Sequence, residues 1–167
     1  MKKLSPKGLK YLKILHLISA IMWIGGATSM VAILYLILPT TPDGYYIRSL
    51  SVKLIDDLLV IPGAIGILIT GIIYGIWSNW GFFKHMWIIV KWVITIVLVI
   101  FGTFVLGEWI NGNVYNQEAI GNYISNHEIF VHNVGQSIFW GSIQTVCLFV
   151  VVWISVIKPW KKKRERD

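Results

Sequence analysis

Four long apolar stretches limit what this sequence can fold into. They cover residues 14–38, 58–77, 87–110 and 132–157, and each holds about the 20 mostly apolar residues that an α-helix needs to cross a bilayer. Hydrophobic residues make up 56% of the chain and charged residues only 14%, whereas soluble domains carry roughly 25% charged residues. The sequence therefore predicts an all-α, polytopic membrane protein: a bundle of four transmembrane helices in contact with the lipid bilayer.

Short polar connections separate the apolar stretches. "LPTTPDGYY" is typical of a Pro/Gly turn, "SNWGF" of a tight turn, and "NGNVYNQEAIGNYISN" of a polar segment without helical periodicity. The first apolar stretch lacks the small-residue cleavage pattern of a removed signal peptide. None of the connections is long enough for a separate domain, so we expect one membrane domain over residues 1–167.

Lysine and arginine residues gather at both ends of the chain, and the connection between residues 110 and 132 has none. The positive-inside rule then places both termini on the cytoplasmic side of the cell membrane. The basic tail directly follows an apolar stretch, where attraction to anionic lipid headgroups is its ordinary role, so we expect no nucleic-acid partner. The basic residues are Lys2, Lys3, Lys7, Lys10, Lys13, Lys158, Lys161, Lys162, Lys163, Arg164 and Arg166.

A histidine lies inside the first apolar stretch. Ionisable residues within spanning segments usually face the bundle interior or a water-filled cavity. A spacing of three to four residues puts one helical stripe through His16, Ala20, Trp23, Ala27 and Met30. An imidazole there can ligate a metal or haem iron while a neighbour holds its other nitrogen. The alternative is a histidine near the membrane interface that is hydrogen-bonded to a serine or a carbonyl.

More imidazole and ammonium groups come at the start of the third apolar stretch. His85 precedes it, Lys91 lies one turn inside it, and both are expected at the same membrane leaflet as His16. Such a set suits a haem with an imidazole on iron and ammonium groups on the propionates, or an anionic headgroup such as a quinol-site ligand. Alternatively, Lys91 snorkels to the headgroups while Trp87 and Trp92 form an aromatic belt.

Carboxylates and imidazoles gather at the opposite, outer end, where they could bind a divalent or cuprous ion. His127 and His132 are five residues apart and do not share one helical face, unlike the paired histidines of strong zinc motifs. His132, Gln136 and Trp140 are spaced to form a row into the bundle. The alternative is a solvated acidic face. The set is Asp56 and Asp57, which open the second stretch, Glu108, which closes the third, and Glu118, His127, Glu128 and His132.

Glycines recur along the second stretch. Gly71 and Gly75 form a GxxxG pair that permits close approach by another helix or by a flat cofactor, and Gly63 and Gly66 precede them. Pro62 is expected to bend or begin the regular helix.

The first three stretches resemble a group of small bacterial membrane proteins. The string "HLISAIMWIGG", with His16 and Trp23, resembles the first helix of the copper resistance protein D membrane domain and of a related family of predicted integral membrane proteins without assigned function. It resembles HemJ-type protoporphyrinogen IX oxidase more distantly. The second stretch, with Pro62 and Gly71, and the string "WIIVK" are similar to the second and third helices of these families.

The resemblance implies a four-helix bundle in which the first-helix histidine serves a haem or a metal. Ile89 stands where the HemJ-type enzymes have a histidine, so the oxidase activity itself does not carry over. We expect a haem b-binding membrane protein in redox chemistry or haem handling. The expected roles are axial ligand for His16, second ligand for His85, propionate or substrate-anion partner for Lys91, and packing wall for Trp23.

Two other functions stay open at this stage. A copper or other metal-ion transport or resistance component would use His132, His127 and Glu128 as ligands. A non-catalytic accessory subunit would use its polar groups only for packing. If the chain is an enzyme, it is a membrane oxidoreductase, and no catalytic residue is assigned. A quinone, a porphyrin or a metal ion would be its small-molecule partner, and a homo-oligomer is compatible with the pattern.

Overall fold

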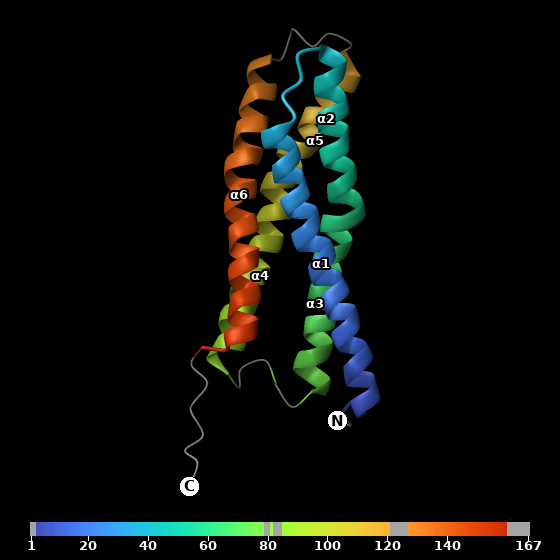
Figure 1. The fold of residues 1–167 in the computed structure, drawn as a ribbon, viewed down its shortest axis with the longest axis vertical. Coiled ribbons are helices and arrows are strands. Elements are labelled where there is room, and N and C mark those ends of the chain that lie inside the picture. The colour runs from blue at the N-terminus through green and yellow to red at the C-terminus, as the bar shows by residue number, and fades with distance from the viewer. Residues whose placement is uncertain (1–2, 79–80, 82–84, 121–126, 160–167) are drawn as a thin grey trace.

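The computed structural model describes residues 3–78, 81, 85–120 and 127–159. Within these residues the regular elements are all helical, and four helical segments are long and apolar enough to cross a membrane. The prediction of an all-α bundle with four spanning helices is therefore confirmed. Figure 1 shows that the start of the first spanning helix and the end of the last lie at the same end of the bundle.

Two of the four segments are continuous helices that change geometry partway along. The second segment joins α2, η1 and α3, and the third joins α4, η2 and α5, where η marks a π-helical stretch. The bounds are α1 Pro6–Leu36, α2 Pro42–Ile55, η1 Asp56–Val60, α3 Ile61–Trp77, α4 Met86–Phe101, η2 Gly102–Leu106, α5 Gly107–Ile120 and α6 His127–Ile157.

Local sequence signals begin the first two segments. The Ser5 hydroxyl accepts a hydrogen bond from the backbone N–H of Gly8 at 3.2 Å, and the Thr41 hydroxyl accepts one from Gly44 at 3.2 Å. A proline follows each cap, at a position where its missing N–H costs no helical hydrogen bond. The turn expected in "LPTTPDGYY" therefore ends at the cap, and the rest of that string is already helical.

The second and third helical segments are longer than their hydropathy indicated. The second has 36 residues, about 54 Å of helix against a hydrocarbon core of about 30 Å. Its polar part, α2, packs against α5, the polar part of the third segment. The interpretation of "NGNVYNQEAIGNYISN" as non-helical is wrong for residues 111–120, which continue α5, while residues 121–126 lie outside the described chain. Hydropathy marks where lipid contact ends, not where backbone hydrogen bonding ends.

For the same reason the acidic residues do not terminate helices. Asp56 and Asp57 lie 14 residues into the second segment, directly after α2, and Glu108 is followed by 12 further helical residues. The expectation that they open and close spans is therefore wrong. Asp56 and Asp57 begin the π-helical stretch η1, and Glu108 lies two residues after η2.

Each π-helical stretch carries a widened hydrogen bond. The N–H of Ile61 bonds to the carbonyl of Asp56, and the N–H of Gly107 bonds to the carbonyl of Gly102, five residues back in both cases. Pro62 follows the first stretch; because it lacks an N–H and crowds the carbonyl four residues before it, it favours such a local widening. π-bulges occur frequently at functional sites.

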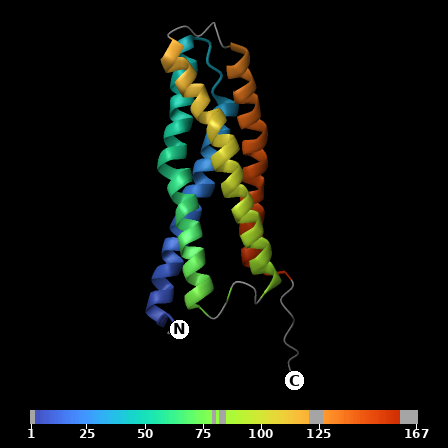
Figure 2. The same ribbon diagram turned by 180° about the vertical axis from the view of Figure 1, so that it is seen from behind.

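Helix packing divides the bundle into a tight seam and a looser middle. α1 packs against α3 along the seam, and α6 packs against α1, α4 and α5 (Figures 1 and 2). A Cβ atom on Gly63 would lie 2.6 Å from the backbone nitrogen of Trp23, and one on Gly66 would collide with the Ser19 hydroxyl. These glycines make the close approach. Gly71 instead faces Trp92 of α4, whose ring would lie 3.3 Å from an added Cβ.

Candidate functional site

The structure places His16 in the α1–α3 seam. Its imidazole is half-buried, and Nδ1 lies 2.7 Å from the Thr70 hydroxyl of α3. That hydroxyl also lies 2.5 Å from the carbonyl oxygen of Gly66, which can only accept, so the hydroxyl donates to it. The hydroxyl must then accept its second hydrogen bond from Nδ1–H. The proton is therefore on Nδ1, and Nε2 keeps a free lone pair.

An aromatic ring completes the surroundings of this histidine. Tyr74, one turn beyond Thr70, meets the imidazole edge-on, with 5.7 Å between ring centroids and an angle of 84° between ring planes. Thr70 and Tyr74 fix the ring plane of His16 from the same helix. This is the arrangement that holds ligating histidines in proteins: one nitrogen is bound by a neighbour and the other is available.

A cationic and aromatic cluster lies at the same end of the bundle, around Trp87. Lys91 and Lys158 each place an ammonium nitrogen 5.8 Å from the centroid of this buried ring. His85, directly before α4, stacks on Trp87 with 6.2 Å between centroids. The structure thus brings Lys91 and His85 together on one tryptophan ring, while His16 lies in the α1–α3 seam.

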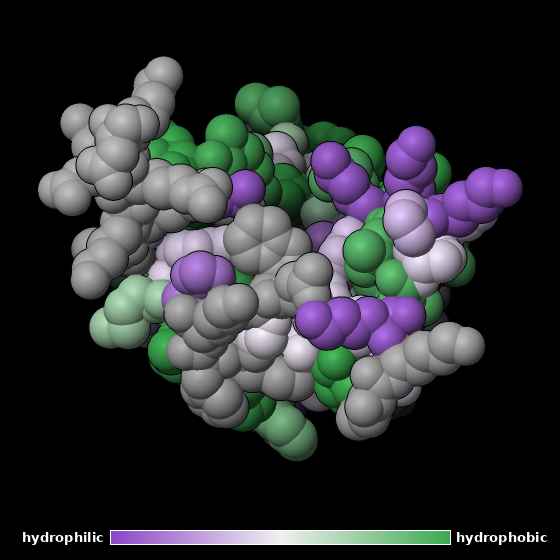
Figure 3. All heavy atoms as spheres, turned by 90° about the horizontal axis from the view of Figure 1, so that it is seen from below, coloured by the Kyte–Doolittle hydropathy of each residue, from purple (hydrophilic) through white to green (hydrophobic). Residues whose placement is uncertain are grey.

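Figure 3 looks onto this end of the molecule, where hydrophilic residues (purple) gather on the side on which α1 begins. Lys7, Lys10 and Lys13 of α1 are all exposed there. The end of α6 lies at the same end of the bundle as the start of α1, so Lys7, Lys10, Lys13 and Lys158 share this end, while residues 1–2 and 160–167 lie outside the described chain.

Trp23 is the most deeply buried of the sequence-predicted residues, with 3% of its surface exposed. It packs with Ala27, Leu98 and Leu148, from α1, α4 and α6. The stripe from Trp23 to Met30 therefore faces the bundle interior, as its spacing predicts.

The outer candidates do not come together. His132 and Glu128 are exposed on α6, and Trp140 is 37% exposed, so the expectation that the row from His132 to Trp140 points into the bundle is wrong. The Trp140 indole donates to Gln136 along the helix surface instead, at 3.0 Å. The side chain of His127 lies outside the described part. Within the described residues, no group of three or more His, Cys, Asp or Glu side chains could hold a metal ion.

Another row of α6 faces the interior, and the sequence reasoning missed it. Asn133, Ser137 and Gln144 are 9%, 5% and 6% exposed, and Gly141 lies on the same stripe. Polar residues spaced by three, four or seven in an apolar span were the available signal. The sequence favoured His132 because of its imidazole, but this residue directly precedes Asn133 and lies on an exposed face of α6.

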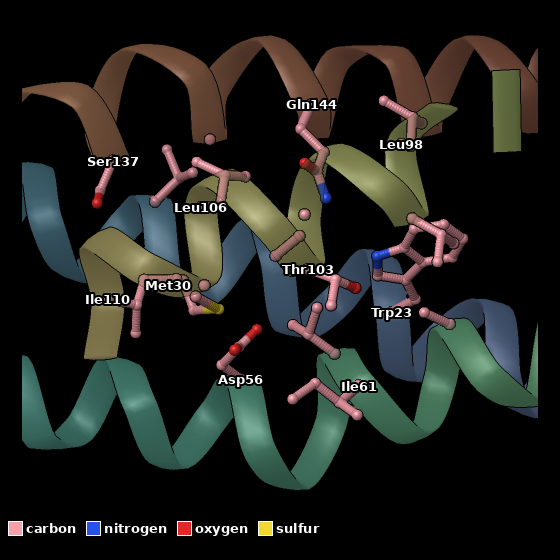
Figure 4. Close-up of a pocket in the computed structure, with 18 of the residues that line it drawn as sticks. Trp23, Met30, Asp56, Ile61, Leu98, Thr103, Leu106, Ile110, Ser137 and Gln144 are labelled. Atoms are coloured by element: carbon pink, nitrogen blue, oxygen red, sulfur yellow. The ribbon is translucent and has the colours of Figure 1, made fainter. Parts of the chain in front are cut away.

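This polar row borders a cavity of about 360 Å³ in the middle of the bundle (Figure 4). The cavity lies between α1 and α6 and touches both π-helical stretches, through Asp56 and Val60 of η1 and Thr103 and Leu106 of η2. Trp23 forms part of its wall. Figure 4 shows Asp56 directed into this space from η1, and Ser137 and Gln144 directed into it from α6 on the opposite side.

Two polar side chains of the cavity lack partners within the described residues. The side-chain oxygens of Ser137 and Gln144 are buried and accept or donate no hydrogen bond within the described protein. Lys53, the nearest cation along the chain, bonds instead to Asp57 at 3.0 Å and to the Asn111 side chain at 2.8 Å. The cavity is therefore a preformed space with unsatisfied polar groups.

Comparison with known proteins gives a family and no closer relative. The model of a family described as predicted integral membrane protein (DUF2269) matches residues 10–159, so the chain belongs to that family. No curated protein and no solved structure matches the chain significantly. Family membership supports the same conclusion as the four spans: this is an integral membrane protein.

Proposed function

We propose that this member of the DUF2269 family of integral membrane proteins binds haem b, with His16 as an axial ligand, and acts in redox chemistry or haem handling. One observation carries the proposal: Nδ1 of His16 is engaged by Thr70, which leaves Nε2 as the free nitrogen inside a membrane span. A bound haem would supply one-electron redox chemistry at its iron.

The chain offers further groups that suit a haem. Lys91 and Lys158 both lie over the Trp87 ring, so two ammonium groups are available at one place to neutralise propionates. His85 is the candidate second ligand because it lies in the same cluster, stacked on Trp87. The half-buried position of His16 keeps its imidazole in low-dielectric surroundings, where the neutral, ligating form is favoured.

The proposal is tested by the absorption spectrum of protein purified in mild detergent from haem-sufficient cells. A Soret band with sharp α and β bands after reduction is expected. His16→Ala should abolish or shift these bands, because loss of an axial ligand changes the spin state of the iron. Lys91→Ala should weaken haem retention and leave the ligation spectrum intact. His85→Ala should change the spectrum only if His85 is the second ligand.

His132→Ala is the matched control, since it removes an exposed imidazole at the opposite end of the bundle. Its spectrum should equal that of the wild type. A colourless wild type that also fails to take up added haemin would refute the proposal. A spectrum lost equally in the His16 and His132 variants would show that the effect is not specific to the site.

We further propose that the protein lies in the cell membrane with both termini cytoplasmic. The basic residues at the end that carries both termini support this orientation. Cysteines placed at Asn116 and Lys163 should be labelled by an impermeant reagent from outside only at the first position. The reverse labelling pattern would place the His16 end of the bundle outside the cell.

A further inference from the structure

The cavity between the two π-helical stretches has the size of a ligand site. Its volume of about 360 Å³ falls within the range of about 300–1,000 Å³ found for small-molecule pockets. It is bounded by elements far apart in the sequence: α1, η1, η2 and α6. Most of its wall is apolar, with Trp23 and Leu98 toward one end and Ile110 toward the other (Figure 4).

The charge of the wall selects the kind of ligand. Among the residues that line the cavity, Asp56 is the one with an ionisable side chain. Its carboxylate points into the space (Figure 4) and forms no hydrogen bond or ion pair within the described residues. An ionised carboxylate inside a spanning bundle needs a counter-charge, because the surroundings solvate it poorly. Lys53, three residues before Asp56, supplies part of this charge, but its ammonium group is bonded to Asp57 and Asn111, so a cation in the cavity would provide the direct counter-charge.

Two further groups on the opposite wall point to the same ligand. The Gln144 side-chain oxygen and the Ser137 hydroxyl oxygen come from residues that are 6% and 5% exposed, and neither oxygen has a hydrogen-bond partner among the described residues. Buried polar atoms are almost always paired, so their missing partner belongs to something that fills the cavity. With Asp56 they present hydrogen-bond acceptors from both sides of the space, which suits a ligand rich in N–H donors.

The mixture of walls favours an organic cation over a metal ion. A hard metal cation needs several oxygen ligands gathered around one point. Here the oxygens come from η1 on one side and from α6 on the other, and apolar side chains occupy most of the wall between them. A molecule with an ammonium group and a small apolar body matches both features.

We propose that this cavity binds a small organic ammonium ion. Its N–H groups pair with Asp56 and reach the Gln144 and Ser137 oxygens, while its apolar body lies against Trp23 and Leu98. The site is separate from His16, which lies two turns from Trp23 along α1.

The test is equilibrium dialysis of labelled 2-phenylethylammonium against the protein in phosphatidylcholine nanodiscs, with empty nanodiscs subtracted. Saturable binding of one ion per chain is expected. Asp56→Asn should weaken it by more than about tenfold, because the buried charge pair is lost. Asp57→Asn is the matched control: it removes a neighbouring carboxylate of the same helix that pairs with Lys53 and does not line the cavity. It should bind as the wild type does.

Other outcomes would overturn the proposal. Equal binding by the wild type and Asp56→Asn, or equal losses of binding in the Asp56 and Asp57 variants, would refute a specific pair between the ammonium ion and Asp56. Equal binding of neutral 2-phenylethanol would indicate an apolar cavity without charge selectivity, and full competition by sodium would indicate a metal-ion site. If Asp56→Asn does not fold, Gln144→Leu is the test variant, since it keeps the side-chain volume and removes one hydrogen-bond acceptor. Unchanged binding of the ammonium ion by Gln144→Leu would then refute the proposal. His16→Ala should leave this binding unchanged whether or not the chain binds haem.

Discussion

The α1–α3 seam and the central cavity satisfy their polar groups in opposite ways. In the seam, His16 bonds to Thr70, Thr70 to the Gly66 carbonyl, and Ser19 to the Leu15 carbonyl. In the cavity, the oxygens of Ser137 and Gln144 have no partner in the described protein. Both regions belong to the same bundle, and α1 and Trp23 contribute to both.

The difference lies in how closely the helices approach. In the seam, glycines let two backbones touch, and short side chains then reach the neighbouring helix. At the cavity, two π-helical stretches lie on either side of the space, and the side chains that face each other do not meet. The seam is therefore a rigid support that orients His16, and the cavity is a space that holds polar groups without hydrogen-bond partners in the described protein. The predictions below separate these two roles.

The largest effect is expected from Gly63→Ala in the seam. The added Cβ would lie 2.6 Å from the Trp23 backbone nitrogen and 2.9 Å from the Ser19 carbonyl oxygen, and neither backbone atom can move alone. The protein should lose about 2–3 kcal/mol of unfolding free energy, measured by thermal unfolding in detergent.

Gly25→Ala is the control for this substitution. Gly25 is exposed and an added Cβ would meet no atom within 4 Å, so the alanine should stabilise the helix by about 0.5–1 kcal/mol. If Gly63→Ala and Gly25→Ala change the free energy of unfolding in the same direction by similar amounts, close backbone contact in the seam is not what makes Gly63 necessary.

A smaller effect of opposite sign is expected in the cavity. Asp56→Asn replaces an unpaired carboxylate by a neutral amide and should stabilise the ligand-free protein by about 1–2 kcal/mol. Asp57→Asn should instead cost about 0.3–0.5 kcal/mol, since its ion pair with Lys53, 3.0 Å long, is partly exposed. Chemical or thermal unfolding of both variants measures whether each substitution raises or lowers the free energy of unfolding. A loss of stability in Asp56→Asn would mean that this carboxylate has a partner in the folded protein.

The third prediction concerns the support that Thr70 gives to His16. Thr70→Val keeps the side-chain shape and removes the acceptor for Nδ1–H, so haem retention should weaken by about tenfold, measured by haemin titration at the Soret band. Thr145→Val is the matched control, because this buried threonine of α6 bonds to a carbonyl of its own helix at 2.8 Å and contacts no histidine. Equal haem retention in the two variants would show that Thr70 does not act through His16.

Part of the site could be predicted from the sequence. The spacing of His16, Trp23 and Met30 placed these residues on one face of α1, since helical periodicity acts within one segment, and the structure shows Trp23 and Met30 of that face to be buried. The bond from His16 to Thr70 could not be predicted, because it joins residues 54 positions apart and depends on the register of two helices. The face of α6 was assigned wrongly through His132, since the spacing of a row shows which residues share a face but not which face is buried.

The sequence by itself determined the number of spans and the all-helical class. These properties follow from transfer of apolar residues into lipid, which depends on composition segment by segment. Tertiary structure alone decided that α2 and α5 extend the inner helices by packing on each other, and that a cavity opens between η1 and η2. Those features arise where side chains from distant segments meet or fail to meet, and no single stretch of the chain encodes the distance between two helices.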